Sequence, residues 1–87
     1  MPNKNILIAE DDADIVELLS LYLTGEGYTV FSAENGLAAL ERIASTKIDL
    51  AILDIMMPEM NGYDVLKRIR ESHNFPVIML SAKELDT

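Results

Sequence analysis

The chain has 87 residues, of which 49% are hydrophobic and 25% are charged, and its 15 acidic against 7 basic residues give a formal net charge of −8. This composition is typical of one ordinary globular domain or less, and no apolar run approaches the roughly 20 residues of a membrane span. The negative charge argues against direct nucleic-acid binding by these residues and favours divalent cations and basic partners. Because the chain has no cysteine, we expect neither disulfides nor a cysteine metal site, and a reducing cytoplasm is the simplest location.

The first predicted strand is the apolar run Asn5–Ala9, and a helix is predicted to begin near Asp14. Asp12 or Asp14 can cap this helix, and Glu17 follows Asp14 at the spacing of a capping box. Glycines at 25 and 27 are expected to end it. The apolar stripe predicted to face the core consists of Ile15, Leu18, Leu19, Tyr22 and Leu23.

The next predicted strand is Thr29–Ala33, which is rich in β-branched and aromatic residues. Asn35 is the expected cap of a second helix. The apolar residues assigned to this second helix are Leu37, Leu40, Ile43 and Ala44.

The third predicted strand, Asp49–Leu53, is an almost continuous aliphatic run. Asn61 and Asp64 are expected to open a third helix, and Pro76–Leu80 is the fourth predicted strand. The third helix has an apolar face of Val65, Leu66 and Ile69.

Strands and helices therefore alternate along the chain, and the strands are mostly aliphatic throughout. This pattern predicts an α/β fold with a doubly wound parallel sheet covered by helices on both faces. In such a sheet, ligands bind at the carboxyl ends of the strands, where the strand order reverses.

Polar side chains follow three of the predicted strands at that end. Glu10, Asp11 and Asp12 come after the first strand, Asp54 after the third, and Ser81 after the fourth. If the first and third strands are neighbours, three or four carboxylates and a hydroxyl meet at one edge of the sheet. Such carboxylates repel one another, and a bound hard divalent cation would offset this repulsion. Mg²⁺, which prefers oxygen ligands, suits the set.

Asp54 is the residue that this arrangement explains best, since a carboxylate beside a bound metal can act as a nucleophile toward a phosphoryl group. The simpler alternative is that acids placed before a helix are caps. We favour the cap for Asp12 and Asp14, and both interpretations stay open for Glu10 and Asp11. Capping does not explain Asp54, because Pro58 lies four residues on and no helix begins directly after it.

The segments ILIAEDD, LAILDIMMPEMNGYDVLKRIR and FPVIMLSAK together resemble the receiver domain of bacterial two-component response regulators. The resemblance covers the whole chain, is most specific in the Asp54–Pro58–Gly62 spacing beside the acidic pair, and is greatest to receivers of OmpR/PhoB-type transcription factors. It implies a flavodoxin-like (CheY-like) fold with strand order 2-1-3-4-5. It also implies a phosphoacceptor in signalling, not a conventional enzyme.

The resemblance implies a role for each matching residue. Asp54 would be the phosphoacceptor, Asp11 a direct Mg²⁺ ligand, and Glu10 a support of the metal through water. Met56 would offer its backbone carbonyl to the metal, and Ser81 would be the switch hydroxyl that meets the phosphoryl group. The implied partner is a sensor histidine kinase, and the implied output is a DNA-binding domain elsewhere in the parent protein.

The chain departs from the family at its C-terminal end, because a complete receiver continues with a fourth helix, a fifth strand and a fifth helix. We therefore expect residues 1–87 to form a partial receiver domain with strand order 2-1-3-4. The lysine that relatives carry before the fifth strand has no counterpart, since Lys83 comes too early. An uncovered fourth strand leads us to expect a homodimer or a complementing segment.

Two other functional classes use similar residues. Phosphatases and phosphotransferases of the haloacid-dehalogenase type also use an aspartate at a strand end with Mg²⁺, but they require a second aspartate two residues later, where this chain has Met56. The third class is a structural or interaction fragment in which the acids serve as caps.

Overall fold

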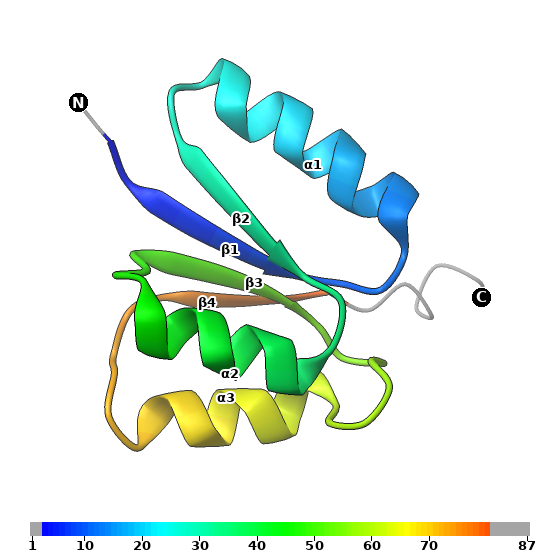
Figure 1. The fold of residues 1–87 in the computed structure, drawn as a ribbon, viewed down its shortest axis with the longest axis vertical. Coiled ribbons are helices and arrows are strands. Elements are labelled where there is room, and N and C mark those ends of the chain that lie inside the picture. The colour runs from blue at the N-terminus through cyan, green and yellow to red at the C-terminus, as the bar shows by residue number, and fades with distance from the viewer. Residues whose placement is uncertain (1–2, 81–87) are drawn as a thin grey trace.

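The structure, a computed structural model, describes residues 3–80. Its strands and helices alternate along the chain, as predicted (Figure 1). The elements are β1 (Asn5–Ala9), α1 (Ala13–Gly25), β2 (Thr29–Ala33), α2 (Gly36–Ser45), β3 (Leu50–Asp54), α3 (Gly62–Arg70) and β4 (Val77–Leu80). Among these helices, none is both long enough and apolar enough to cross a membrane.

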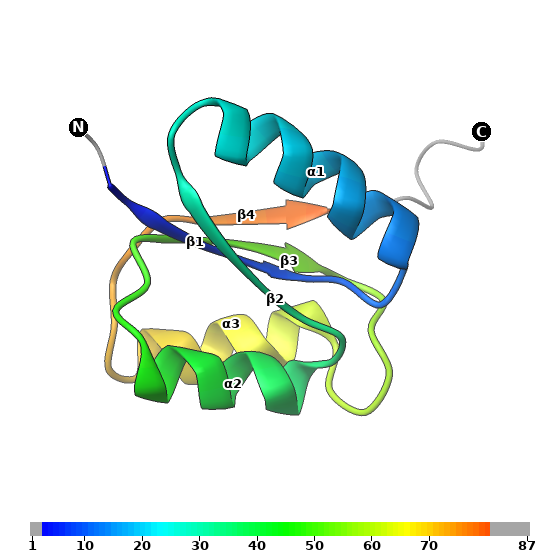
Figure 2. The same ribbon diagram turned by 45° about the horizontal axis from the view of Figure 1, so that its top comes forward.

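The strands form one parallel sheet in the order β2-β1-β3-β4, which confirms the predicted incomplete flavodoxin-like arrangement. Figure 2 shows α1 on one face of this sheet and α2 with α3 on the other. Because the strand order reverses between β1 and β3, the carboxyl ends of these two neighbours lie at the position where such folds bind ligands.

Successive side chains of each strand point to opposite faces, so the sheet contributes to two separate cores. The smaller core, under α1, contains Ile6, Ile8 and Ile52. The larger core lies under α2 and α3, and its buried residues are Leu7, Ala9, Ala33, Ala39, Ile43, Ile48, Ala51, Leu53, Met57, Val65 and Ile69.

All three helices begin at a side chain that accepts a backbone hydrogen bond from the first turn. Asp12 accepts from the Asp14 N–H at 2.9 Å, and Asn35 accepts from the Ala38 N–H at 2.8 Å. Asn61 accepts from the N–H of Asp64 at 3.0 Å. The predicted asparagine caps are confirmed, whereas the capping-box pairing of Asp14 is wrong because Asp12 occupies the cap position.

The buried face of α1 differs from the predicted stripe. Val16, Leu19 and Leu23 pack against the smaller core, whereas Leu18 and Tyr22 are 68% and 67% exposed. The helix carries apolar residues around most of its circumference, and apolar spacing alone therefore does not identify the side that meets the sheet.

The face of α2 also needs correction, while that of α3 is confirmed. In α2 the buried side chains are Ala39 and Ile43, and Leu37 is 51% exposed. In α3, Val65 and Ile69 are fully buried, as predicted.

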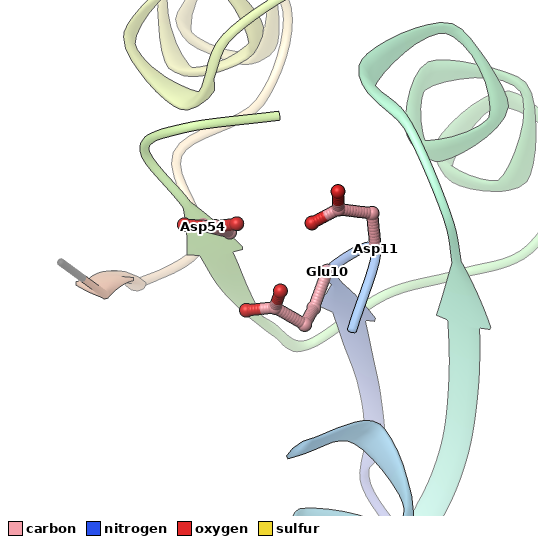
Figure 3. Close-up of side chains that lie close together, drawn as sticks. All are labelled: Glu10, Asp11 and Asp54. Carbon is pink, nitrogen blue, oxygen red and sulfur yellow. The ribbon is translucent and has the colours of Figure 1, made fainter. Parts of the chain in front are cut away.

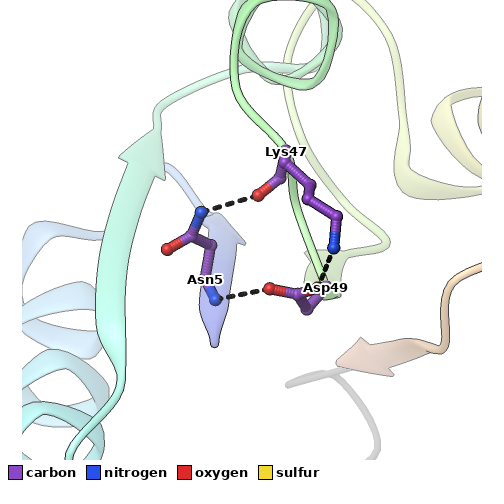
Figure 4. A network of polar contacts seen from close by, with 3 residues as sticks. All are labelled: Asn5, Lys47 and Asp49. Atoms are coloured by element: carbon purple, nitrogen blue, oxygen red, sulfur yellow. Dashed lines mark hydrogen bonds and ion pairs between the residues drawn. The ribbon is translucent and has the colours of Figure 1, made fainter. Parts of the chain in front are cut away.

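At the amino end of the sheet, Asp49 precedes β3 instead of opening it as predicted. Its carboxylate accepts the Asn5 N–H at 2.8 Å and pairs with the Lys47 ammonium at 3.2 Å (Figure 4). The Asn5 side-chain amide in turn donates to the Lys47 carbonyl at 2.7 Å. The Asn5 N–H and the Lys47 charge hold the pKa of Asp49 below its ordinary value. This network aligns the starts of β1 and β3, and with them the register of the sheet.

Candidate functional site

Two carboxylates are brought side by side by the register of β1 and β3. The last pairs of this ladder are Ile8 with Ile52 and Ala9 with Leu53. Glu10 and Asp54 follow one residue later, and parallel strands lie about 4.8 Å apart. Both side chains are nearly inaccessible, with 6% exposure for Glu10 and 7% for Asp54.

Asp11 completes a group of three. One carboxylate oxygen from each of Glu10, Asp11 and Asp54 lies within 4.8 Å of the other two. Figure 3 shows the Glu10 and Asp11 side chains leaving the tip of β1 and Asp54 at the tip of β3. Unlike its two neighbours, Asp11 is exposed, so this group opens to solvent on one side.

Glu10 is held in place by the backbone that follows it. The Asp12 N–H donates to its carboxylate at 3.0 Å. Burial raises the pKa of Glu10 to about 7, and the neighbouring Asp54 adds to the shift, against the opposing effect of the Asp12 hydrogen bond. A carboxyl group in this condition favours either a proton or a cation.

Asp54 is positioned by the loop that leads to α3. The Met56 N–H donates to the Asp54 carboxylate at 3.1 Å, which leaves the second carboxylate oxygen without that contact. The Gly62 N–H closes the loop by donating to the Ile55 carbonyl at 3.0 Å. Gly62 lies so close that a Cβ on it would be 2.5 Å from the Asp54 carbonyl oxygen. Glycine is thus required where α3 begins.

The three carboxylates suit a hard cation by their chemistry and spacing. Mg²⁺ binds oxygen ligands at 2.0–2.1 Å in an octahedron and usually keeps several waters. Ligand oxygens around it are therefore about 3–4 Å apart. The three carboxylate oxygens lie within 4.8 Å of one another, and the exposed Asp11 side chain has room to adjust to the ion.

The predicted site residues divide into three groups in the structure. Glu10, Asp11 and Asp54 lie together, as the strand order predicted. Met56 borders the group through its backbone, and its side chain is 58% exposed. Ser81 and Lys83 lie outside the described residues.

Two features of the site were not found from the sequence. Glu59, in the loop between β3 and α3, has a positive φ of 71°. A positive φ is usually predicted from a glycine, and this position holds a glutamate. Gly36, the first residue of α2, lies against the same loop at Met60. The sequence hint of this close approach is a glycine at the start of a predicted helix, because alanine has the higher helix propensity there.

Comparison with known proteins places this geometry in one family. The model of the response regulator receiver domain matches residues 6–87. The response regulator GtcR of Aneurinibacillus migulanus is 45% identical over 85 residues, which are 98% of this chain and 35% of that protein. The transcriptional regulatory protein CpxR of Escherichia coli is 46% identical over 83 residues, 93% of this chain and 35% of that protein. The chain thus spans about a third of the length of these relatives.

A solved structure shares the fold as well. The response regulator TrrA from Thermotoga maritima, solved in complex with Mg²⁺ and BeF, matches with a TM-score of 0.85 and 42% identity. The match covers 91% of this chain and 70% of that chain.

Proposed function

This chain belongs to the family of response regulator receiver domains, and on that premise we propose that Asp54 receives a phosphoryl group from a sensor histidine kinase, with Mg²⁺ bound beside it. The observation that supports this most strongly is the meeting of Glu10, Asp11 and Asp54 at the carboxyl ends of β1 and β3. Two of these carboxylates are buried, where a negative charge is costly without a counter-charge.

The residues proposed to hold Mg²⁺ are Asp11 and Asp54 directly, Glu10 through water, and Met56 through its backbone carbonyl. When bound, the cation neutralises charge on the phosphoryl oxygens and on the carboxylates around them. Family membership and the Mg²⁺ in the TrrA complex support this choice of metal.

The proposed transfer needs only the Asp54 carboxylate as nucleophile. One of its oxygens attacks the phosphorus of a phosphohistidine on the kinase, so that a P–O bond forms and the P–N bond breaks. The departing imidazole nitrogen keeps the bonding electron pair and takes up a proton from solvent. The Met56 N–H, bound to one Asp54 oxygen, fixes the rotation of the carboxylate and leaves the other oxygen for the attack. Ser81 is the proposed hydroxyl that meets the transferred group.

The output is proposed to lie in the rest of a longer protein. One of the relatives, about three times as long as this chain, is named a transcriptional regulatory protein. This name supports a longer protein in which the receiver controls a DNA-binding domain. The excess of acids argues against DNA binding by residues 1–87 themselves. Family membership supports a cytoplasmic location, where sensor kinases present their phosphohistidine.

Phosphorylation of the longer protein by a small acyl phosphate in the presence of Mg²⁺ tests this function. We expect a mass increase of one phosphate that is lost in Asp54→Asn and retained in Asp64→Asn, a matched change of an exposed acid in the first turn of α3. A phosphate that survives Asp54→Asn contradicts the assignment.

A further inference from the structure

The loop between β3 and α3 has a strained backbone that must be held by contacts. The Met60 N–H donates to the Pro58 carbonyl at 2.7 Å, which makes a three-residue turn around Glu59. The φ of Glu59 in this turn is 71°, a value that residues other than glycine rarely adopt. Such conformations persist only where the surrounding structure imposes them.

One of the segments that hold this loop in place is α2, a helix that carries none of the three carboxylates. A Cβ built on Gly36 would lie 2.6 Å from the Met60 carbonyl oxygen and 2.7 Å from the Met60 Cβ. It would also be 2.8 Å from a methyl group of Val65. Two of these three atoms belong to the loop backbone or are attached directly to it, so rotation of a side chain cannot relieve the overlap.

We infer that Gly36 is a positioning residue for the metal and phosphoryl site, which it acts on through the Met60 backbone. The loop is closed at its ends by the Gly62–Ile55 hydrogen bond, and Met56 lies inside it. A displacement of Met60 by several tenths of an ångström must therefore be absorbed between Ile55 and Gly62. The inference rests on the proposed function in assigning Met56 and Asp54 to the metal.

The expected consequence is a loss of metal affinity without loss of any ligand. Changes in the groups that orient metal ligands typically weaken binding by 10–100-fold. For Gly36→Ala we expect weakening of roughly tenfold, because the added methyl shifts the loop but leaves Asp11 and Asp54 in place.

The experiment is an NMR titration with Mg²⁺ alone of the longer protein that contains residues 1–87, uniformly ¹⁵N-labelled, as wild type, Gly36→Ala and Gly25→Ala. Gly25 is a matched control because it also lies at a helix end and a Cβ there would meet nothing within 4 Å. In metal-free spectra, Gly36→Ala should move the amide resonances of Met56 and Gly62, and Gly25→Ala should not. With Mg²⁺, only Gly36→Ala should raise the dissociation constant.

Unchanged Met56 and Gly62 resonances in Gly36→Ala, together with an unchanged Mg²⁺ affinity, would overturn the inference. A wild type that binds no Mg²⁺ would defeat the proposed function instead, while the metal-free spectra would still decide whether the loop depends on Gly36. If Gly36→Ala does not fold, Met60→Gly takes its place, because it removes the Cβ that rests on Gly36 without filling the space. It should move the same resonances and weaken Mg²⁺ binding, and an unchanged spectrum at Met56 and Gly62 would again overturn the inference.

Discussion

Asp11 and Asp14 are both exposed acids near the start of α1, and only the first belongs to the carboxylate group. Diffuse negative charge would attract Mg²⁺ through either residue, whereas a coordinated ion depends on the ligand alone. We therefore expect Asp11→Ala to abolish the Mg²⁺-dependent change in an NMR titration of the longer protein, and Asp14→Ala to leave it intact. Equal effects of the two substitutions would indicate non-specific attraction to the surface.

Glu10 gives a pH-dependent prediction for the metal-free protein. Its folded-state pKa is raised from 4.5 to about 7, so its contribution to stability is fully present below pH 4.5 and is lost as the pH rises to 7. A shift of this size corresponds to roughly 3–4 kcal/mol at most. Glu10→Gln keeps an acceptor for the Asp12 N–H and removes the charge. We expect it to raise the melting temperature at pH 8 by several degrees and to change it little at pH 4.5.

The control for this prediction is Glu17→Gln, on an exposed acid of α1. It should have a small effect at both pH values, because surface substitutions usually change stability by less than 0.5 kcal/mol. A Glu10→Gln protein with the same gain at pH 4.5 and pH 8 would show that ionisation of Glu10 does not destabilise the fold.

Among the connections within residues 3–80, the turn at Glu59 is the one in which a residue other than glycine has a positive φ. A β-branched residue tolerates a positive φ least, and glycine tolerates it without strain. We expect Glu59→Val to lower the free energy of unfolding by about 1–2 kcal/mol, and Glu59→Gly to leave it unchanged or raise it by up to about 1 kcal/mol. Urea denaturation followed by circular dichroism measures both.

Glu71→Val is the matched change at an ordinary φ of −69° at the end of α3. Its effect on unfolding should be within about 0.5 kcal/mol. If Glu59→Val and Glu71→Val destabilise equally, the cost belongs to the valine side chain and not to the turn.

The elements that the sequence predicted well are those determined by local chemistry. The aliphatic runs form β1, β3 and β4, and the β-branched and aromatic run forms β2. Asn35 and Asn61 cap α2 and α3 because a side-chain oxygen satisfies a free N–H there. The meeting of Glu10 with Asp54 was expected on the condition that the first and third strands are neighbours. The resemblance to receiver domains implied that order, and the sheet has it.

The features that the sequence did not predict depend on contacts between distant segments. Leu18 and Leu37 have the same chemistry as buried leucines, and only the packed structure shows that both are exposed. The approach of Gly36 to Met60 joins residues 24 positions apart, and nothing in either segment alone indicates it. The positive φ of Glu59 is likewise imposed by its surroundings.

At the scale of the whole molecule, the two faces of the sheet are covered unequally. Among the elements of residues 3–80, α2 and α3 pack on one face and α1 packs on the other (Figure 2). On that face a groove of about 500 Å³ is lined by apolar residues that include Ile52, which is buried, and Ile78, which is 49% exposed. Within residues 3–80, β4 is also an edge of the sheet. Each 100 Å² of apolar surface left in water costs about 2.5 kcal/mol, a sizeable part of the roughly 5–15 kcal/mol by which a typical domain is stable.

We therefore expect the 87-residue chain to form a homodimer, or to require a complementing segment, when it is purified alone. Sedimentation at micromolar concentration should give a mass above that of the monomer. Ile78→Lys should lower the measured mass toward that of the monomer. Leu37→Lys, at a similarly exposed residue on the other face, should not. A compact monomer that unfolds cooperatively at this concentration would refute the prediction.

Binding of beryllofluoride, an analogue of the phosphoryl group, tests the proposal of a Mg²⁺-dependent phosphoacceptor at Asp54 most directly. Fluorine NMR of the protein with beryllofluoride should show bound resonances only when Mg²⁺ is present. These resonances should be absent in Asp54→Asn and retained in Asp64→Asn. Bound resonances that persist in Asp54→Asn, or that form equally well without Mg²⁺, would contradict the account, and a complete absence of binding would leave the acids of β1 and β3 without the role assigned to them.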